Sequence, residues 1–258
     1  METLTLPQKS TPSKRFEDYT YLIYGERKIG KTTLFSEFAD PFFFMFEPGG
    51  RSLSIKQAFM KNWDTALGYL ALLEKNKNYC KTVIIDTGYM AYERCFEYCL
   101  RKMGIIDPKD KAFGSAWKLI DKEFRDFHLR LFSLGCCIGV TAHSEIKEVQ
   151  TREGVKYDKL VTQLSAQANR YYCGTMDVVG YYQYDATGGR VLTVRGDTFV
   201  DAGSRIKDHF YYKGTQEPII NIMMGKTEKE AYTNLVKGFN NEIEKTNVTK
   251  TAKISKVH

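Results

Sequence analysis

A short segment near the start of the chain has the residue types and spacing of a phosphate-binding loop. Residues 25–32, Gly-Glu-Arg-Lys-Ile-Gly-Lys-Thr, fit the pattern GxxxxGK[ST], with a strand candidate before them and a helix candidate after them. In such a loop, backbone N–H groups hold a polyphosphate at the start of the helix, and glycine permits the tight turn and the close approach to the oxygens. We therefore expect the contacts to such a ligand to come from Gly25, Lys28, Ile29, Gly30, Lys31, Thr32 and Thr33.

Two side chains of this loop have separate expected roles. Lys31 would place a mobile positive charge on the β- and γ-phosphates, and the Thr32 hydroxyl would ligate Mg²⁺. The alternative is an ordinary strand-to-helix turn with an exposed lysine. The flanking strand and helix candidates favour the phosphate loop over this alternative.

A second GKT sequence provides a control for this interpretation. Residues 225–227 have the same ending, but Ile220 stands where the first glycine would be. Here we predict the start of a helix, with Thr227 as its N-cap and Glu230 completing a capping box.

Two carboxylates follow apolar strand candidates and would complete the chemistry. Asp86 ends the apolar run 82–86 and is expected to hold the hydration shell of Mg²⁺, with helix capping as the alternative role. Glu47 follows the aromatic run 42–46 and precedes a Pro-Gly-Gly turn, which would leave its carboxylate exposed to polarise an attacking water. The residue after Asp86 is Thr87, so the catalytic glutamate must come from elsewhere, and Glu47 is the best candidate.

The only evidence in the sequence on which base the nucleotide carries is the absence of a motif. A guanine-reading NKxD sequence is absent, because residues 76–79 read Asn-Lys-Asn-Tyr and fail at the last position. This favours ATP over GTP.

The chain around these residues is typical of strands that alternate with helices. Strand candidates lie at 19–24, 42–46, 82–86, 136–141 and 178–184, and helix candidates lie at 31–39, 63–75, 90–103 and 116–133. Apolar runs that are buried on both faces and separated by helices indicate a parallel sheet with helices on either side. We therefore predict an α/β fold.

The pattern changes from residue 145 onward. Segments 146–150 and 155–157 flank a turn at 151–154 and predict a β-hairpin, and a second turn at 186–190 precedes a strand at 191–194. A surface helix is predicted over 226–245. We expect one domain over residues 16–244, between a flexible N-terminal tail at 1–15 and a flexible basic C-terminal tail at 245–258.

Composition excludes several classes of protein. The chain has 43% hydrophobic and 27% charged residues, as a globular protein does, and no apolar run approaches the roughly 20 residues of a membrane-spanning helix. The six cysteines include no CxxC motif, and the N-terminus has no secretion signal, so we expect a cytoplasmic location. We expect no metal site at Cys95 and Cys99. The net charge of +7 is compatible with a polyanionic partner.

The order of these motifs resembles the RecA-like ATPase core. Residues 25–32, Glu47 after the second strand, Asp86 after the third and Val-Thr-Ala-His at 140–143 after the fourth stand in the order found there. In detail the chain is similar to phage-encoded AAA-type nucleotide-binding proteins, including the small RecA-like recombinases that partner single-strand annealing. The resemblance covers residues 19–207.

The resemblance implies Mg²⁺-dependent ATP binding and hydrolysis, with Lys31 and Glu47 as catalytic residues and Asp86 as the carboxylate of the magnesium waters. It also places the fourth strand between the first and the third, so that His143 would be a catalytic sensor of the γ-phosphate. The alternative for His143 is a buried histidine bonded to a backbone carbonyl. Ring-forming or filament-forming relatives complete the site with a basic residue of the next subunit, and the candidates for that role are Arg190, Arg195, Arg205 and Lys207.

The resemblance further implies action on single-stranded DNA in phage recombination or replication, as a homo-oligomer in the host cytoplasm. A phage single-strand-binding or annealing protein is a further candidate partner. Candidate DNA contacts are Lys147, Arg152 and Lys156 around the hairpin, and Arg170, Tyr171 and Tyr172. Two other functions remain open: a small-molecule kinase with a basic lid at 100–111, and a nucleotide-gated binding module with little hydrolysis.

Overall fold

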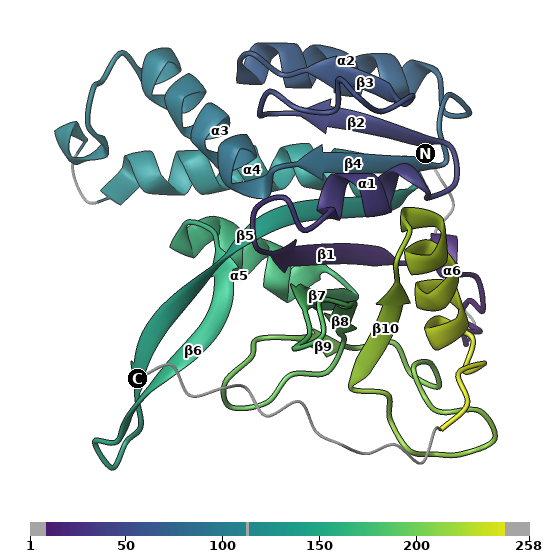
Figure 1. The fold of residues 1–258 in the computed structure, drawn as a ribbon. Coiled ribbons are helices and arrows are strands. Elements are labelled where there is room, and N and C mark those ends of the chain that lie inside the picture. Colours follow the sequence, from purple (N-terminus) through teal and green to yellow (C-terminus); the bar gives the residue numbers. More distant parts are fainter. Residues whose placement is uncertain (1–8, 112–113, 246–258) are drawn as a thin grey trace.

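A computed structural model describes residues 9–111 and 114–245 of the chain (Figure 1). The strands are β1 (Thr20–Gly25), β2 (Pro41–Met45), β3 (Lys56–Phe59), β4 (Thr82–Asp86), β5 (Cys137–Gln150), β6 (Lys156–Gln163), β7 (Val178–Tyr184), β8 (Arg190–Thr193), β9 (Gly203–Ser204) and β10 (Asn221–Gly225). The helices are α1 (Lys31–Ser36), α2 (Trp63–Lys75), α3 (Gly88–Met103), α4 (Ser115–Phe132), α5 (Ala166–Thr175) and α6 (Glu228–Phe239), with short 3₁₀ turns at Phe16–Asp18 and Pro108–Asp110.

The described strands form one sheet, whose main path has the order β10-β8-β7-β1-β5-β4-β2-β3, with β6 paired to β5 and β9 paired to β7. Every pair from β7 to β3 along this order is parallel, whereas β8 and β10 add an antiparallel edge. The α/β fold with a mainly parallel sheet is therefore confirmed. Strand β5 lies between β1 and β4, as the resemblance implied.

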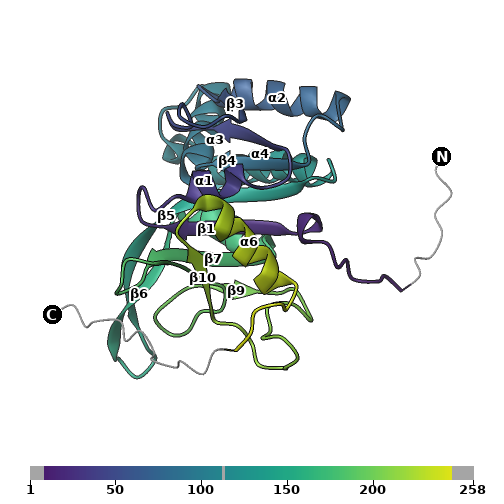
Figure 2. The same ribbon diagram turned by 45° about the vertical axis from the view of Figure 1, so that its right-hand side comes forward.

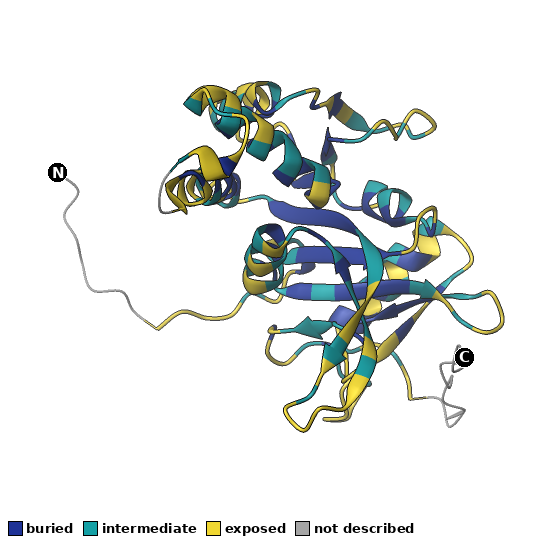
Figure 3. Cartoon of the chain, turned by 90° about the vertical axis from the view of Figure 1, so that its left-hand side faces the viewer, coloured by how far each residue is buried: buried dark blue, intermediate teal, exposed yellow. Residues whose placement is uncertain are grey.

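Helices cover both faces of the sheet because its central strands are apolar on both sides. In β1, Leu22 and Tyr24 pack into one core with α2, α3, α4 and α5, whereas Tyr21 and Ile23 pack into a second core with α1 and α6. This alternation is the period of two that a strand requires. Figure 3 shows the result, with buried central strands and helices whose outer turns are exposed.

The second half of β5 leaves the sheet and pairs with β6 as a long antiparallel hairpin, from His143↔Gln163 to Gln150↔Lys156. It projects away from the helices in Figures 1 and 2. The predicted hairpin is thus confirmed, and the predicted strand 136–141 is the first half of a longer one. The turn predicted at 186–190 joins the antiparallel strands β7 and β8.

Two predicted helices extend further than the observed ones. The first helix ends at Ser36 rather than residue 39, and the last ends at Phe239 rather than residue 245. Strands β3, β9 and β10 were not predicted. The residues of β3 are Lys-Gln-Ala-Phe, with Ala58 buried and Phe59 exposed, so their polarity does not alternate as in a typical strand.

The predicted tails remain predictions for the most part, because residues 1–8 and 246–258 lie outside the described residues. Lys245 lies within the described part and pairs with Glu217. In the part of the chain that the structure describes, no helix is long and apolar enough to cross a lipid bilayer.

Candidate functional site

The phosphate loop connects β1 to α1 with the backbone that its glycines permit. Gly30 is the N-cap of α1 and has φ +106°, a left-handed conformation that favours glycine. Gly25 is fixed by packing instead, because an added Cβ would lie 2.0 Å from the carbonyl oxygen of Tyr182 on β7. Ile29 is buried and anchors the loop, so its backbone N–H is the group that it could offer to a phosphate, as in the loop predicted from the sequence.

Lys31 is folded back onto its own loop. Its Nζ donates to the carbonyl oxygens of Gly25 (2.9 Å) and Glu26 (2.7 Å), and the side chain is buried. This burial lowers the pKa of Lys31 to about 8, although the nearby carboxylates of Asp86 and Glu47 oppose the shift. The ammonium group is thus held by carbonyls that a phosphate can replace.

Thr32 and Asp86 meet although they are 54 residues apart in the sequence. The Thr32 Oγ1 hydroxyl donates to Asp86 Oδ2 at 2.7 Å, and Thr141 Oγ1 donates to Oδ1 at 2.5 Å. A hydroxyl oxygen that donates its proton keeps two lone pairs, so Thr32 can donate to Asp86 and ligate a cation at the same time. The hydrogen bond turns the lone pairs of the Thr32 oxygen away from the carboxylate of Asp86.

These oxygens fit Mg²⁺, which binds through one or two protein groups together with waters and substrate phosphates. Among residues 9–111 and 114–245 there is no cluster of three His, Cys, Asp or Glu side chains that could hold a metal ion by themselves. Cys95 and Cys99 are among the residues to which this applies. The donor set therefore suits a cation that arrives with a nucleotide.

Glu47 stands beside the two other polar groups at this edge of the sheet. Its Oε1 accepts from the Thr87 hydroxyl at 2.6 Å, and its Oε2 lies 4.0 Å from His143 Nε2. His143 and Thr87 lower the pKa of the Glu47 carboxyl against the opposing effect of its partial burial, which keeps it ionised. The Nδ1 of His143 is buried without a hydrogen-bond partner among the described residues, so the expected alternative of a carbonyl-bonded histidine is not what the structure shows.

Strand register explains why these residues gather. Met45 pairs with Asp86 across β2 and β4, and Gly25 pairs with His143 across β1 and β5. Since carboxyl ends of parallel strands share one edge, Glu47, Asp86 and His143 all lie at the end where the phosphate loop begins.

Two site residues were missed by sequence reasoning. Thr141 and Thr87 are buried polar residues that bond Asp86 and Glu47 respectively. A signal for Thr141 was present, because a hydroxyl inside the apolar run 137–142 needs a partner when it is buried. Thr87 was noted only as the residue that occupies the place of a glutamate.

The four basic candidates for a neighbouring subunit's site lie in different places. Arg190 is beside the chain's own phosphate loop, where its Nη1 would lie 3.3 Å from a Cβ added to Gly30. It also bonds the start of α6 through Glu228 Oε1 (3.3 Å) and the Lys226 carbonyl (3.0 Å). Arg195 bonds the carbonyl of His209, and Lys207 is exposed.

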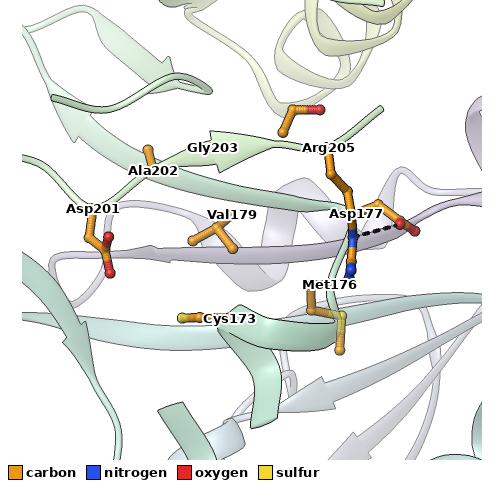
Figure 4. A pocket seen from close by; sticks show the side chains of 9 residues that line it. Cys173, Met176, Asp177, Val179, Asp201, Ala202, Gly203 and Arg205 are labelled. Carbon is orange, nitrogen blue, oxygen red and sulfur yellow. Dashed lines mark ion pairs between the residues drawn. The ribbon is translucent and has the colours of Figure 1, made fainter. Parts of the chain in front are cut away.

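Arg205 belongs to a pocket of about 310 Å³ between β7 and the segment 201–205 (Figure 4). Its Nε pairs with Asp177 Oδ1 at 3.2 Å, and Asp177 Oδ2 accepts from both the backbone N–H and the hydroxyl of Thr20 at 2.9 Å. Both charges are therefore satisfied within the protein. The bonds of Asp177 connect the start of β7 to the start of β1. None of the phosphate-loop residues lines this pocket.

The candidate DNA-contacting residues differ in how available their side chains are. Lys147 and Lys156 of the hairpin are neutralised by Glu145 (2.8 Å) and Glu148 (2.7 Å). Tyr172 is fully buried, with its hydroxyl 2.8 Å from His128 Nε2, so its ring is not available to stack on a base.

No curated protein matches the chain. A KaiC-like protein from the hyperthermophilic archaeon Pyrococcus horikoshii OT3 is similar over 83% of this chain and 88% of its own, with 15% sequence identity and a TM-score of 0.45. A family model described as an AAA domain matches residues 17–206, which contain the phosphate loop, Glu47, Asp86 and His143. With most of its length matched, the chain belongs to the AAA domain family of P-loop NTPases.

Proposed function

We propose that the protein is a Mg²⁺-dependent ATPase. One observation carries the proposal: the 2.7 Å hydrogen bond between Thr32 of the phosphate loop and Asp86 at the end of β4. It joins a phosphate-binding segment to a carboxylate in the arrangement that orients a hydroxyl ligand toward a cation. Adenine is proposed over guanine because no NKxD motif is present in the sequence.

Each residue of the site has a defined part in the proposed reaction. Lys31 moves from the carbonyls of its loop to the phosphates, and Glu47, held by Thr87, accepts a proton from the attacking water. The water oxygen bonds to the γ-phosphorus while the bond to the β–γ bridging oxygen breaks, which yields ADP and phosphate. His143 at the end of β5 lies beside Glu47 and keeps that carboxylate ionised. Bound Mg²⁺ would neutralise charge on the phosphates.

Phosphate release from ATP with Mg²⁺, compared with EDTA, tests this function. Glu47→Gln should lower kcat at least about a hundredfold while a fluorescent ATP analogue still binds. Glu26→Gln is the matched control, because Glu26 is an exposed carboxylate of the same loop. Unchanged turnover in Glu47→Gln would favour the nucleotide-gated binding module. Failure of the wild type to bind the analogue would refute the nucleotide site itself.

A kinase is not favoured, because its expected lid lies far from the site. Helix α3 starts at Gly88, directly after the site residues, and Arg101 stands 13 residues further, about 20 Å along the helix axis. Arg101 is also bonded to Asp64 of α2, and Lys102 to Tyr98. Transfer of phosphate to a nucleoside or sugar instead of water would reverse this conclusion.

We also propose single-stranded DNA as the macromolecular partner, in phage recombination or replication and as a homo-oligomer within the host cytoplasm. The net charge of +7 and the resemblance to recombinase-associated proteins support this part. Binding to oligo-dT, and its effect on phosphate release, tests it separately from ATP binding. Absence of DNA binding would leave the ATPase proposal intact. Mixing with a phage single-strand-binding or annealing protein would test that further candidate partner.

A further inference from the structure

A groove between α4 and α5 has chemistry that the nucleotide site does not use. It encloses about 470 Å³, and its wall includes the partly exposed Tyr171 above the buried rings of Tyr92 and Phe124, with Lys118, Arg125 and Arg170 around it. Lys118 and Arg125 come from α4, and Arg170 and Tyr171 from α5. The groove is thus built by helices on one face of the sheet, and none of the phosphate-loop residues lines it.

The positive charges of the groove are available. Within the described ranges, no ion pair involves Lys118, Arg125 or Arg170, and all three side chains are exposed. The Nε of Arg125 donates to the Asp121 carbonyl at 3.2 Å, which leaves its terminal nitrogens free. Asp121 is the single carboxylate lining the groove and accepts from the Tyr92 hydroxyl at 3.4 Å. An excess of two positive charges therefore faces solvent here, unlike the neutralised lysines of the hairpin.

The aromatic wall has one unsatisfied polar atom. The Tyr171 hydroxyl is buried and has no hydrogen-bond partner among the described residues. Its ring packs edge-on against Phe124, with centroids 5.7 Å apart. Burying a hydroxyl without a partner costs free energy, and a ligand that offers an acceptor would recover it.

From these features we infer that the groove binds a nucleoside phosphate unit, with the phosphate at the three cations and the base beside the partly exposed Tyr171. The assignment to a unit of single-stranded DNA, rather than to a free nucleotide, rests on the DNA partner proposed above. Cations beside aromatic side chains are the combination by which proteins hold single strands without reading sequence. The open, exposed rim suits a continuous strand.

Anisotropy of labelled oligo-dT with the full-length protein tests the inference. Arg125→Ala and Arg170→Ala should each weaken binding about tenfold and reduce the salt slope of log K by about one, because each removes one phosphate contact. Lys122→Ala is the matched control, since Lys122 is a cation of α4 that pairs with Asp126 and does not line the groove. It should bind like the wild type.

Tyr171→Phe keeps the ring and the fold and removes only the hydroxyl, so a several-fold loss of affinity would place the ligand at this atom. Equal binding by the wild type and both arginine variants would overturn the inference while leaving the DNA proposal standing. A wild type that binds neither oligo-dT nor dTMP would refute both. Binding of dTMP alone, lost in Arg170→Ala, would support the groove and overturn its assignment to DNA. ATP-analogue binding, measured in parallel, reports on the separate nucleotide site.

Discussion

Raising the pH through about 8 should weaken nucleotide binding, because Lys31 loses its charge there. Burial lowers the pKa of Lys31 in the free protein to about 8. Phosphates favour the ammonium form, so the pKa of Lys31 rises in the complex, and binding takes up a proton between the two values. Affinity is therefore full below the pKa of the free protein and declines as the pH rises above it.

The size of the effect follows from the fraction of Lys31 that is charged before binding. With a pKa of about 8, that fraction falls from about three quarters at pH 7.5 to about 3% at pH 9.5, so affinity should fall about 25-fold, or about 1.9 kcal/mol. The terminal phosphate is already ionised in this range, because its pKa is about 6. The lysine is thus the group at the phosphates whose charge changes most across this interval.

Titration of a fluorescent ATP analogue at constant ionic strength over this pH range measures the effect. Lys31→Ala should bind more weakly, since it loses charge-assisted hydrogen bonds worth about 1.5–3 kcal/mol, and its affinity should be flat with pH. A flat wild-type curve, or an equal slope in Lys31→Ala, would show that Lys31 is not the titrating contact.

Four further substitutions have definite expected results. Asp86→Asn should raise the Mg²⁺ concentration for half-maximal phosphate release about tenfold or more, because a charged oxygen is lost near the cation; an unchanged requirement would contradict its role. Arg190→Ala should weaken ATP-analogue binding, whereas Glu228→Gln, which frees Arg190 from its ion pair, should strengthen it; effects of the same sign would show that the pair only supports the fold. Thr141→Val should lower the free energy of unfolding by about 1–3 kcal/mol in urea, since Asp86 loses a buried hydrogen bond; equal stability would show that the bond contributes nothing.

The sequence predicted which residues gather at the candidate site better than it predicted the outer elements of the fold. Glu47, Asp86 and His143 each follow an apolar run, and a parallel sheet brings the ends of such runs together whatever the details of packing. Helix ends depend on single residues instead. Helix α6 stops because the chain turns at Asn241, which adopts a left-handed conformation (φ +60°) that the periodicity of its apolar residues does not reveal.

The position of Arg190 could not be predicted, because it depends on pairings between distant segments. Gly25 can start the phosphate loop against β7 only without a side chain, and that close approach sets β7, and with it β8, beside β1. Arg190 at the start of β8 is thereby brought to Gly30, 160 residues earlier in the chain. The sequence shows a loop that can bind phosphate, whereas the register of the sheet decides which cations surround it. Sequence motifs therefore predict which residues can form the site, and strand pairing determines the charges that surround it.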